Sequence, residues 1–156
     1  MIGTKWGALA VLGAGLVVSG CQSAAIDTTE TTAITPISKD ISATDLEAGK
    51  AQFREANYGL AEKHFRKAVE LRADNAEAWM GLAASYDQLG RFDFADRAYD
   101  QLIKVAGRQP RIVNNMGYSK LLRGDKKAAR KLLTEAQAAL PGDVVVEANL
   151  NLLAKG

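Results

Sequence analysis

The sequence predicts an all-α fold built from repeated helix-turn-helix units. Residues of similar size recur every 34 positions from Ser42 onwards, and a period of this length is typical of stacked repeats. The chain is rich in Ala and contains three Pro, which favours helix. Gly90 and Gly124 stand one period apart between apolar segments, where the tight turn of a helical hairpin needs a residue that accepts a positive φ.

The composition excludes several classes of function. The 156 residues suffice for one domain, and a net charge of +2 is too small to indicate a nucleic-acid-binding protein. The single Cys excludes an intrachain disulfide and a zinc site built from cysteines, and the single His argues against a His-based metal site. No nucleophile is spaced to pair with a general base. We therefore predict a non-catalytic protein without cofactor or metal.

Residues 1–20 have the features of a secretory signal peptide. Lys5 supplies a positive charge, and an uncharged apolar segment runs from Trp6 to Val18. This segment is shorter than the roughly 20 apolar residues that a membrane-spanning helix needs. A positive start, a short apolar segment and small residues at its end are typical of a signal peptide that directs export.

A more specific motif ends this segment. Val18, Ser19, Gly20 and Cys21 resemble the lipobox of bacterial lipoproteins, in which an aliphatic and two small residues precede an obligatory Cys. The resemblance implies that Cys21 receives a diacylglycerol thioether and that a lipoprotein signal peptidase cleaves before it, after which the new amino terminus is acylated. Several acyl chains, palmitate among them, anchor a protein to a membrane without spanning it. The alternative is an ordinary signal peptide with an incidental Cys.

Residues 21–40 join this anchor to the rest of the chain. Thr and Ser dominate them, Pro36 interrupts them, and they contain no aromatic residue. This composition predicts a flexible tether, which would reach roughly 25 Å as a coil and at most about 65 Å when extended. In enteric bacteria an Asp directly after the lipidated Cys retains a lipoprotein in the inner membrane. Gln22 therefore favours the outer membrane, with the domain facing the periplasm.

Residues 41–156 form the predicted repeat domain, with repeats at 42–75, 76–109 and 110–143. Small residues recur at the eighth and twentieth positions of each repeat and large residues at the twenty-fourth. The small ones let the two helices of a hairpin approach, and the large ones fill the remaining space. The small residues are Gly49, Ala83, Gly117, Ala61, Ala95 and Ala129, and the large ones are Phe65, Tyr99 and Leu133.

This pattern resembles the tetratricopeptide repeat (TPR), most clearly at Trp79, Leu82 and Tyr86. The resemblance covers residues 42–142 and implies a superhelix of three helix-turn-helix repeats. Asp143 is placed to cap a further helix at 144–154, which would cover the third repeat. The first repeat departs from the pattern at Asp45 and Gln52, where Trp and Tyr are usual, so we expect a looser first helix there.

The resemblance also implies a binding site. In TPR arrays the first helices of the repeats line a concave groove, which binds extended or helical peptides. The matching positions suggest a protein partner in the bacterial cell envelope rather than a small molecule or nucleic acid. The candidate groove residues are Met80, Arg111, Asn114, Tyr118 and Leu121.

Charge is distributed unevenly along the repeats. Residues 104–131 contain nine basic residues and one acidic residue, a net charge of +8, whereas residues 40–103 contain eight basic and twelve acidic residues, a net charge of −4. Two interpretations stay open: solvated helix faces, or a basic end that meets an acidic partner or anionic headgroups. Asp93, Asp96 and Asp100 share one helix face, which we interpret as a solvated acidic face, and His64 is interpreted as a surface or half-buried helix residue.

A lipoprotein of this size with one TPR domain resembles the Tad (tight-adherence) pilus assembly lipoproteins. The likeness lies in the stretches 89–92, 114–118 and 122–125. It implies a scaffold or adaptor with a pilotin-like role, which helps an outer-membrane secretin to localise or assemble. The alternatives are a general scaffold for outer-membrane assembly or peptidoglycan enzymes, and, with no residue in its favour, an enzyme.

Overall fold

A computed structural model describes residues 40–155 of the chain. The predicted signal peptide, the predicted lipidation site Cys21 and the predicted tether up to residue 39 lie outside these described residues. Within residues 40–155, no helix combines the length and the apolar character that crossing a membrane requires.

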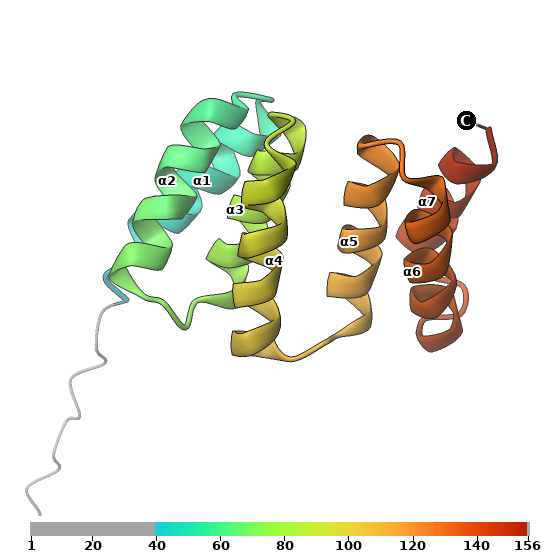
Figure 1. The fold of residues 1–156 in the computed structure, drawn as a ribbon. Coiled ribbons are helices and arrows are strands. Elements are labelled where there is room, and N and C mark those ends of the chain that lie inside the picture. The colour runs from blue at the N-terminus through green and yellow to red at the C-terminus, as the bar shows by residue number, and fades with distance from the viewer. Residues whose placement is uncertain (1–39, 156) are drawn as a thin grey trace, which may run out of the picture. The chain divides into compact units, whose positions relative to one another are not determined.

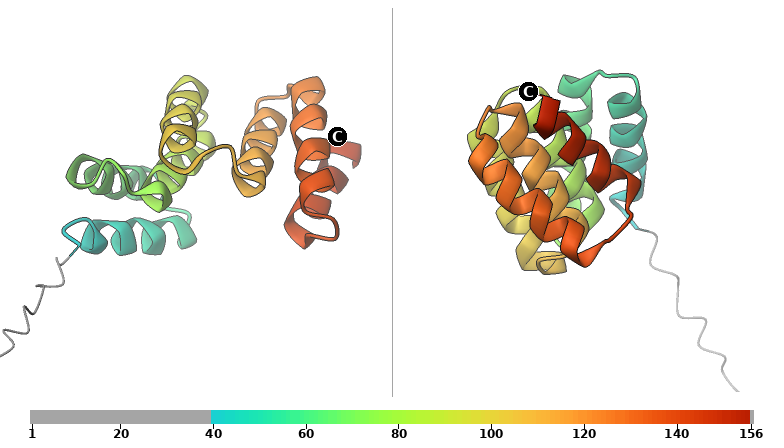
Figure 2. Two further views of the ribbon diagram at one scale, coloured as in Figure 1. Left: turned by 90° about the horizontal axis from the view of Figure 1, so that it is seen from below. Right: turned by 90° about the vertical axis from the view of Figure 1, so that its right-hand side faces the viewer.

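Seven α-helices make up the described part of the chain (Figure 1). Three successive hairpins are formed by α1 with α2, α3 with α4 and α5 with α6, and α7 follows at the end of the array farthest from α1 (Figure 2). The predicted all-α fold of TPR-type helix-turn-helix repeats is therefore confirmed. The helices are α1 (Ala43–Arg54), α2 (Tyr58–Leu71), α3 (Ala76–Gln88), α4 (Phe92–Ala106), α5 (Pro110–Leu122), α6 (Lys126–Ala139) and α7 (Val144–Lys155).

Local sequence explains where the helices begin. The side chain of Asn75 accepts a hydrogen bond from the Ala78 backbone N–H at 3.0 Å, and that of Asp125 accepts one from Ala128 at 3.0 Å. Asp143 accepts from the backbone of Val146 at 3.1 Å ahead of α7. Each of these side chains satisfies an N–H that has no partner inside its helix.

The hairpin turns share one backbone conformation. Gly90 and Gly124 have φ angles of 68° and 80°, and Ala56, at the same position of the first repeat, has a φ of 58°. Glycine adopts this left-handed conformation freely, whereas a side chain at Cβ makes it costly. The first hairpin therefore carries backbone strain that the other two avoid.

Close helix packing occurs where the small residues recur. Ala61, Ala95 and Ala129 are completely buried. The ring of Phe65 from α2 fits between two glycines, because a Cβ on Gly49 would lie 2.8 Å from the ring and one on Gly81 would lie closer still. The short side chains thus bring the helices together around a large one, as the repeat pattern predicts.

The looser first helix expected from Asp45 is not found. α1 is a regular helix of 12 residues, and Asp45 is buried in it. Its carboxylate lies 3.0 Å from Lys67 Nζ and 3.1 Å from His64 Nδ1, both on α2. Hydrogen bonds from His64 and Lys67 lower the pKa of Asp45. A polar contact to α2 therefore replaces the aromatic packing that is usual at this position, and it gives the half-buried His64 a structural role.

Candidate peptide-binding groove

A groove follows the odd-numbered helices. Its first part, the N-terminal hollow, is lined by residues of α1 and α3, with Phe65 of α2 at its floor. Most of this lining is apolar, which suits the side chain of a bound peptide. The lining residues are Lys50, Phe53, Arg54, Phe65, Glu77, Met80, Gly81 and Ala84.

The two basic residues of the N-terminal hollow differ in their pairing. Lys50 Nζ lies 2.8 Å from Glu77 and 2.9 Å from Glu47, so its charge is balanced within the domain. Arg54 is exposed at the end of α1 and has no ion pair within residues 40–155. Arg54 is therefore the cation that this hollow can offer to a partner.

The second part, the C-terminal hollow, shares Met80 with the first. Val144 and Val145, at the start of α7, are 76% and 55% exposed on its edge. Arg111 is exposed and has no ion pair within the described residues. Apolar surface beside an unpaired guanidinium suits a peptide with an apolar side chain next to a carboxylate. The lining residues are Met80, Arg111, Asn114, Asn115, Leu140, Asp143, Val144, Val145 and Val146.

The structure brings three of the predicted groove residues together, namely Met80, Arg111 and Asn114. Asn114, however, is only 4% exposed. Its side chain accepts a hydrogen bond from Asn149 Nδ2 at 3.0 Å and donates one to Asn115 Oδ1 at 3.3 Å. Asn114 therefore holds α5 against α7, and its amide is not presented to a partner as the sequence suggested.

The other two predicted groove residues lie farther along α5 and line neither hollow. Leu121 is half-buried against an apolar cluster formed by Ala129, Leu133 and Leu153. Tyr118 is half-buried one helical turn after Asn114. Leu121 thus packs against α6 and α7, because α7 turns that part of α5 into an interface.

Six residues that line the C-terminal hollow were not predicted from the sequence, namely Asn115, Leu140, Asp143, Val144, Val145 and Val146. Groove residues were expected from their position within a repeat, whereas Val144 and Val145 belong to α7, which follows the last repeat. The alternation of helices along the chain was a usable signal. Because α7 follows α6, it takes the place of the first helix of a next repeat and continues the row of α1, α3 and α5.

A polar network joins the second and third hairpins beside the groove. The buried carboxylate of Asp87 on α3 accepts hydrogen bonds from Ser119 Oγ at 2.6 Å and from the Tyr99 hydroxyl at 3.0 Å. Burial raises the pKa of Asp87, and these two hydrogen bonds offset that effect only in part. The charge of Asp87 is therefore costly, and its two hydroxyl partners make it tolerable.

Asp96 on α4 extends this network, which corrects the interpretation of a solvated acidic face. Its carboxylate lies 2.8 Å from Arg123 and 3.1 Å from Lys120, both on or next to α5. Burial raises the pKa of Asp96, but the hydrogen bonds from Arg123 and Lys120 outweigh it and lower the pKa overall. Part of the positive charge of residues 104–131 is thus neutralised by a carboxylate outside that segment.

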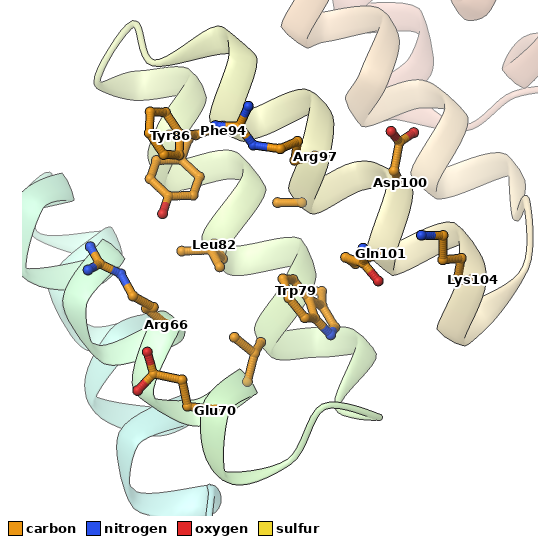
Figure 3. A pocket seen from close by; sticks show the side chains of 12 residues that line it. Arg66, Glu70, Trp79, Leu82, Tyr86, Phe94, Arg97, Asp100, Gln101 and Lys104 are labelled. Carbon is orange, nitrogen blue, oxygen red and sulfur yellow. The ribbon is translucent and has the colours of Figure 1, made fainter.

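An outer hollow lies between α2 and α4, over α3 (Figure 3). Trp79 and Phe94 contribute aromatic surface to it, and Arg66 and Arg97 contribute positive charge. These groups already have partners: Arg66 pairs with Glu62, Arg97 lies 4.4 Å above the Phe94 ring, and Trp79 donates to the Ala73 carbonyl. The arginines and aromatic rings of the outer hollow are therefore engaged within the domain, although Glu70, Asp100 and Lys104 of its lining form no ion pair within residues 40–155. Among residues 40–155, no group of three potential ligands could hold a metal ion.

Comparison with known families identifies the repeats. Two tetratricopeptide-repeat family models match residues 52–114 and 85–144. The chain is a tetratricopeptide-repeat protein. Domains of this family bind proteins or peptides, and the repeat fold is a scaffold for such contacts.

Individual relatives are distant. The chain is 29% identical over 104 residues to the cytochrome c-type biogenesis protein CycH of Pseudomonas aeruginosa, a match that covers 65% of this chain and about a quarter (26%) of CycH. The structure of Pseudomonas aeruginosa PilF is similar with a TM-score of 0.62 at 24% identity, covering 73% of this chain and 52% of PilF. The Yersinia enterocolitica type III secretion chaperone SycD, in complex with a peptide of the translocator YopD, is similar with a TM-score of 0.62 at 20% identity, covering 77% and 92% of the two chains. The two structural similarities concern the fold.

Proposed function

We propose that this TPR protein is a lipid-anchored adaptor of the cell envelope, which holds a segment of a protein partner in its groove. The observation that carries the proposal is the groove itself, where exposed Val144 and Val145 lie beside the unpaired Arg111, and Met80 connects to a second apolar hollow. The lipobox at residues 18–21 supports the anchor, with the outer membrane, facing the periplasm, as its expected location.

The partner that we favour belongs to an envelope assembly machine, such as the secretin of a Tad-type pilus. The resemblance of stretches 89–92, 114–118 and 122–125 to Tad lipoproteins supports this choice. The adaptor would then act as a pilotin does, by holding the secretin near the membrane while it localises or assembles. No catalysis is part of this role.

A second candidate is a role in cytochrome c biogenesis. The 29% identity to CycH favours it, over the quarter of CycH that the chain matches. In this case the groove would bind a component of the cytochrome c maturation apparatus. General scaffolding of outer-membrane assembly or peptidoglycan enzymes is the broader alternative.

The anchor is tested by labelling cells with a palmitate analogue. The wild-type protein should incorporate the label and the Cys21→Ser variant should not, because the thiol that carries the lipid is removed. The variant should also accumulate as an uncleaved or mislocalised precursor. Normal labelling of the variant would refute the lipid anchor without affecting the groove.

The groove is tested by affinity capture from detergent-solubilised envelopes. The double variant Arg54→Ala/Arg111→Ala removes two exposed cations with no ion pair within residues 40–155, so its stability should stay near that of the wild type. Capture of the partner should fall by roughly tenfold or more, as for the loss of contacts at the centre of an interface. Lys63→Ala, which removes a single exposed cation of α2 outside the groove, is the control.

The identity of the captured proteins decides between the candidates. Secretin or pilus components lost with the groove variant support the first proposal, and cytochrome c maturation proteins support the second. If no envelope protein is recovered in different amounts with the groove variant and with Lys63→Ala, the groove proposal is wrong.

A further inference from the structure

The outward surface of α6 carries a row of basic side chains, which we call the basic face: Lys127, Arg130 and Lys131. Together with Lys126 and Thr134 they line a shallow hollow on this helix. Residues three and four apart lie on the same side of a helix, so the three charges are neighbours. All three side chains are exposed.

The fold does not use most of this charge. Within residues 40–155, Lys127 and Arg130 form no hydrogen bond or ion pair. Lys131 lies within electrostatic reach of Glu135, but the carboxylate of Glu135 is held by two hydrogen bonds from Arg108 at 3.0 and 2.9 Å. The basic face therefore remains available to an outside partner.

The remaining basic residues of the 104–131 segment are partly neutralised. Arg108 is paired with Glu135, and Lys120 and Arg123 are both paired with Asp96. The unbalanced positive charge of the segment is therefore concentrated on α6, and outside α6 it is left on Lys104 of α4 and on Arg111 in the groove. The structure thus places most of the unbalanced charge of residues 104–131 on one helix.

We propose that the basic face adsorbs to anionic phospholipid headgroups. The hollow between its side chains is lined by Lys, Arg and Thr alone, whereas protein interfaces depend on aromatic or apolar anchors at their centre. Adsorption to an anionic bilayer needs only exposed basic residues. The proposal rests on the proposed lipid anchor for its location, since the 19 residues from Gln22 to Asp40 span at most about 65 Å and keep the domain close to a bilayer.

The first test measures the exposure of single lysines on the full chain reconstituted in vesicles. Acylation of Lys127 and Lys131 is compared with that of Lys63 by mass spectrometry, in phosphatidylcholine vesicles with and without phosphatidylglycerol. Phosphatidylglycerol should slow labelling of Lys127 and Lys131 several-fold and leave Lys63 unchanged. Added salt should restore the labelling, because it screens attraction between exposed charges. Equal labelling in both kinds of vesicle would overturn the proposal.

The second test measures binding with neutralised side chains. Co-sedimentation of the mature chain, residues 21–156 with Cys21→Ser, with phosphatidylglycerol vesicles is compared with that of the same chain carrying Lys127→Gln/Arg130→Gln/Lys131→Gln. The partition coefficient should fall by roughly 10²-fold, because each basic residue near an anionic surface contributes a factor of about five. The matched control, Lys63→Gln/Arg91→Gln/Lys104→Gln, loses the same charge elsewhere and should change it much less.

The outcomes separate this proposal from the proposed function. Equal losses in the variant and its control would mean that net charge alone attracts the protein, which overturns a specific face. If Lys127 and Lys131 are protected only by a captured protein partner, the face is a protein interface and the lipid proposal is wrong. Palmitate labelling of the wild type reports on the anchor independently of either result.

Discussion

The two junctions between successive hairpins have the same place in the repeat and different chemistry. Between the first and second hairpins, the Phe65 ring is enclosed by Gly49 and Gly81 within one apolar cluster that includes Leu82 and Tyr86. The same cluster extends to Ile112 of α5, but between the second and third hairpins Asp87 and Asp96 also hold α5 through hydroxyl and basic side chains. An apolar junction tolerates any partner of the right shape, whereas a buried polar junction requires each group to find its own partner. One repeat pattern can therefore produce junctions of quite different sensitivity.

Removal of the enclosed ring should have the largest effect. Phe65→Ala leaves a cavity between α1, α2 and α3 and should lower the free energy of unfolding by about 3–5 kcal/mol. Urea denaturation followed by circular dichroism measures it. Phe94→Ala is the control, because Phe94 is 50% exposed and its loss should cost much less. Similar losses for both variants would mean that the junction does not depend on the enclosed ring.

Removal of the buried carboxylate should have a smaller and more local effect. Asp87→Ala removes the carboxylate that accepts hydrogen bonds from the hydroxyls of Ser119 and Tyr99, and it should cost about 1–3 kcal/mol. Amide hydrogen exchange should speed up in α5, α6 and α7 more than in α1 and α2, because only the second junction is weakened. Asp100→Ala, at an exposed site of α4, should change neither. Uniformly faster exchange along the chain would contradict the local effect.

The same carboxylate should make the polar junction sensitive to pH. The folded-state pKa of Asp87 is raised above its ordinary value of 3.8, so its contribution to stability is complete below that pH and is lost as the pH rises through the raised pKa. Wild type should therefore gain stability relative to Asp87→Asn on going from pH 7 to pH 4. Each pKa unit of difference corresponds to about 1.4 kcal/mol.

The contribution of Asp96 to stability depends on pH in the opposite direction, and it changes at lower pH. Its pKa is lowered below 3.8, so its contribution is present above that pH and is lost as the pH falls through the lowered pKa. Urea denaturation of wild type and of Asp87→Asn at several pH values separates the contributions of the two carboxylates to stability, because only wild type contains Asp87. A constant difference between wild type and Asp87→Asn over pH 4–7 would show that Asp87 does not titrate with folding.

The smallest effect should be a gain in stability in the first hairpin. Ala56→Gly relieves the positive φ of 58° and should stabilise the protein by about 0.5–1 kcal/mol. Gly90→Ala, at the equivalent turn of the second hairpin, should destabilise it by a similar amount. Thermal unfolding measures the change in melting temperature of each variant. Changes in the same direction would refute the shared turn conformation.

Three of the polar contacts that the sequence did not predict have a similar spacing. Asp87 and Ser119 are 32 residues apart, Asn114 and Asn149 are 35 apart, and Asp40 and Arg72 are 32 apart. Each separation in sequence is close to the repeat length of 34 residues, because equivalent positions of successive repeats lie side by side. A search for polar residues about 34 positions apart gives a signal for these pairs, although it does not say which of them are buried.

By itself, the sequence determined the repeats, the hairpins and the close packing of Ala61, Ala95 and Ala129, which are all completely buried. These features follow from residue size and turn chemistry, which act over one or two helical turns. Only the tertiary structure decided that Asn114 and Leu121 face neighbouring helices, that Asp87 and Asp96 hold a junction, and that Val144 and Val145 extend the groove. The physical reason is that the role of a buried polar side chain depends on the group to which it hydrogen-bonds. The stacking of separate repeats determines which group lies within hydrogen-bonding distance.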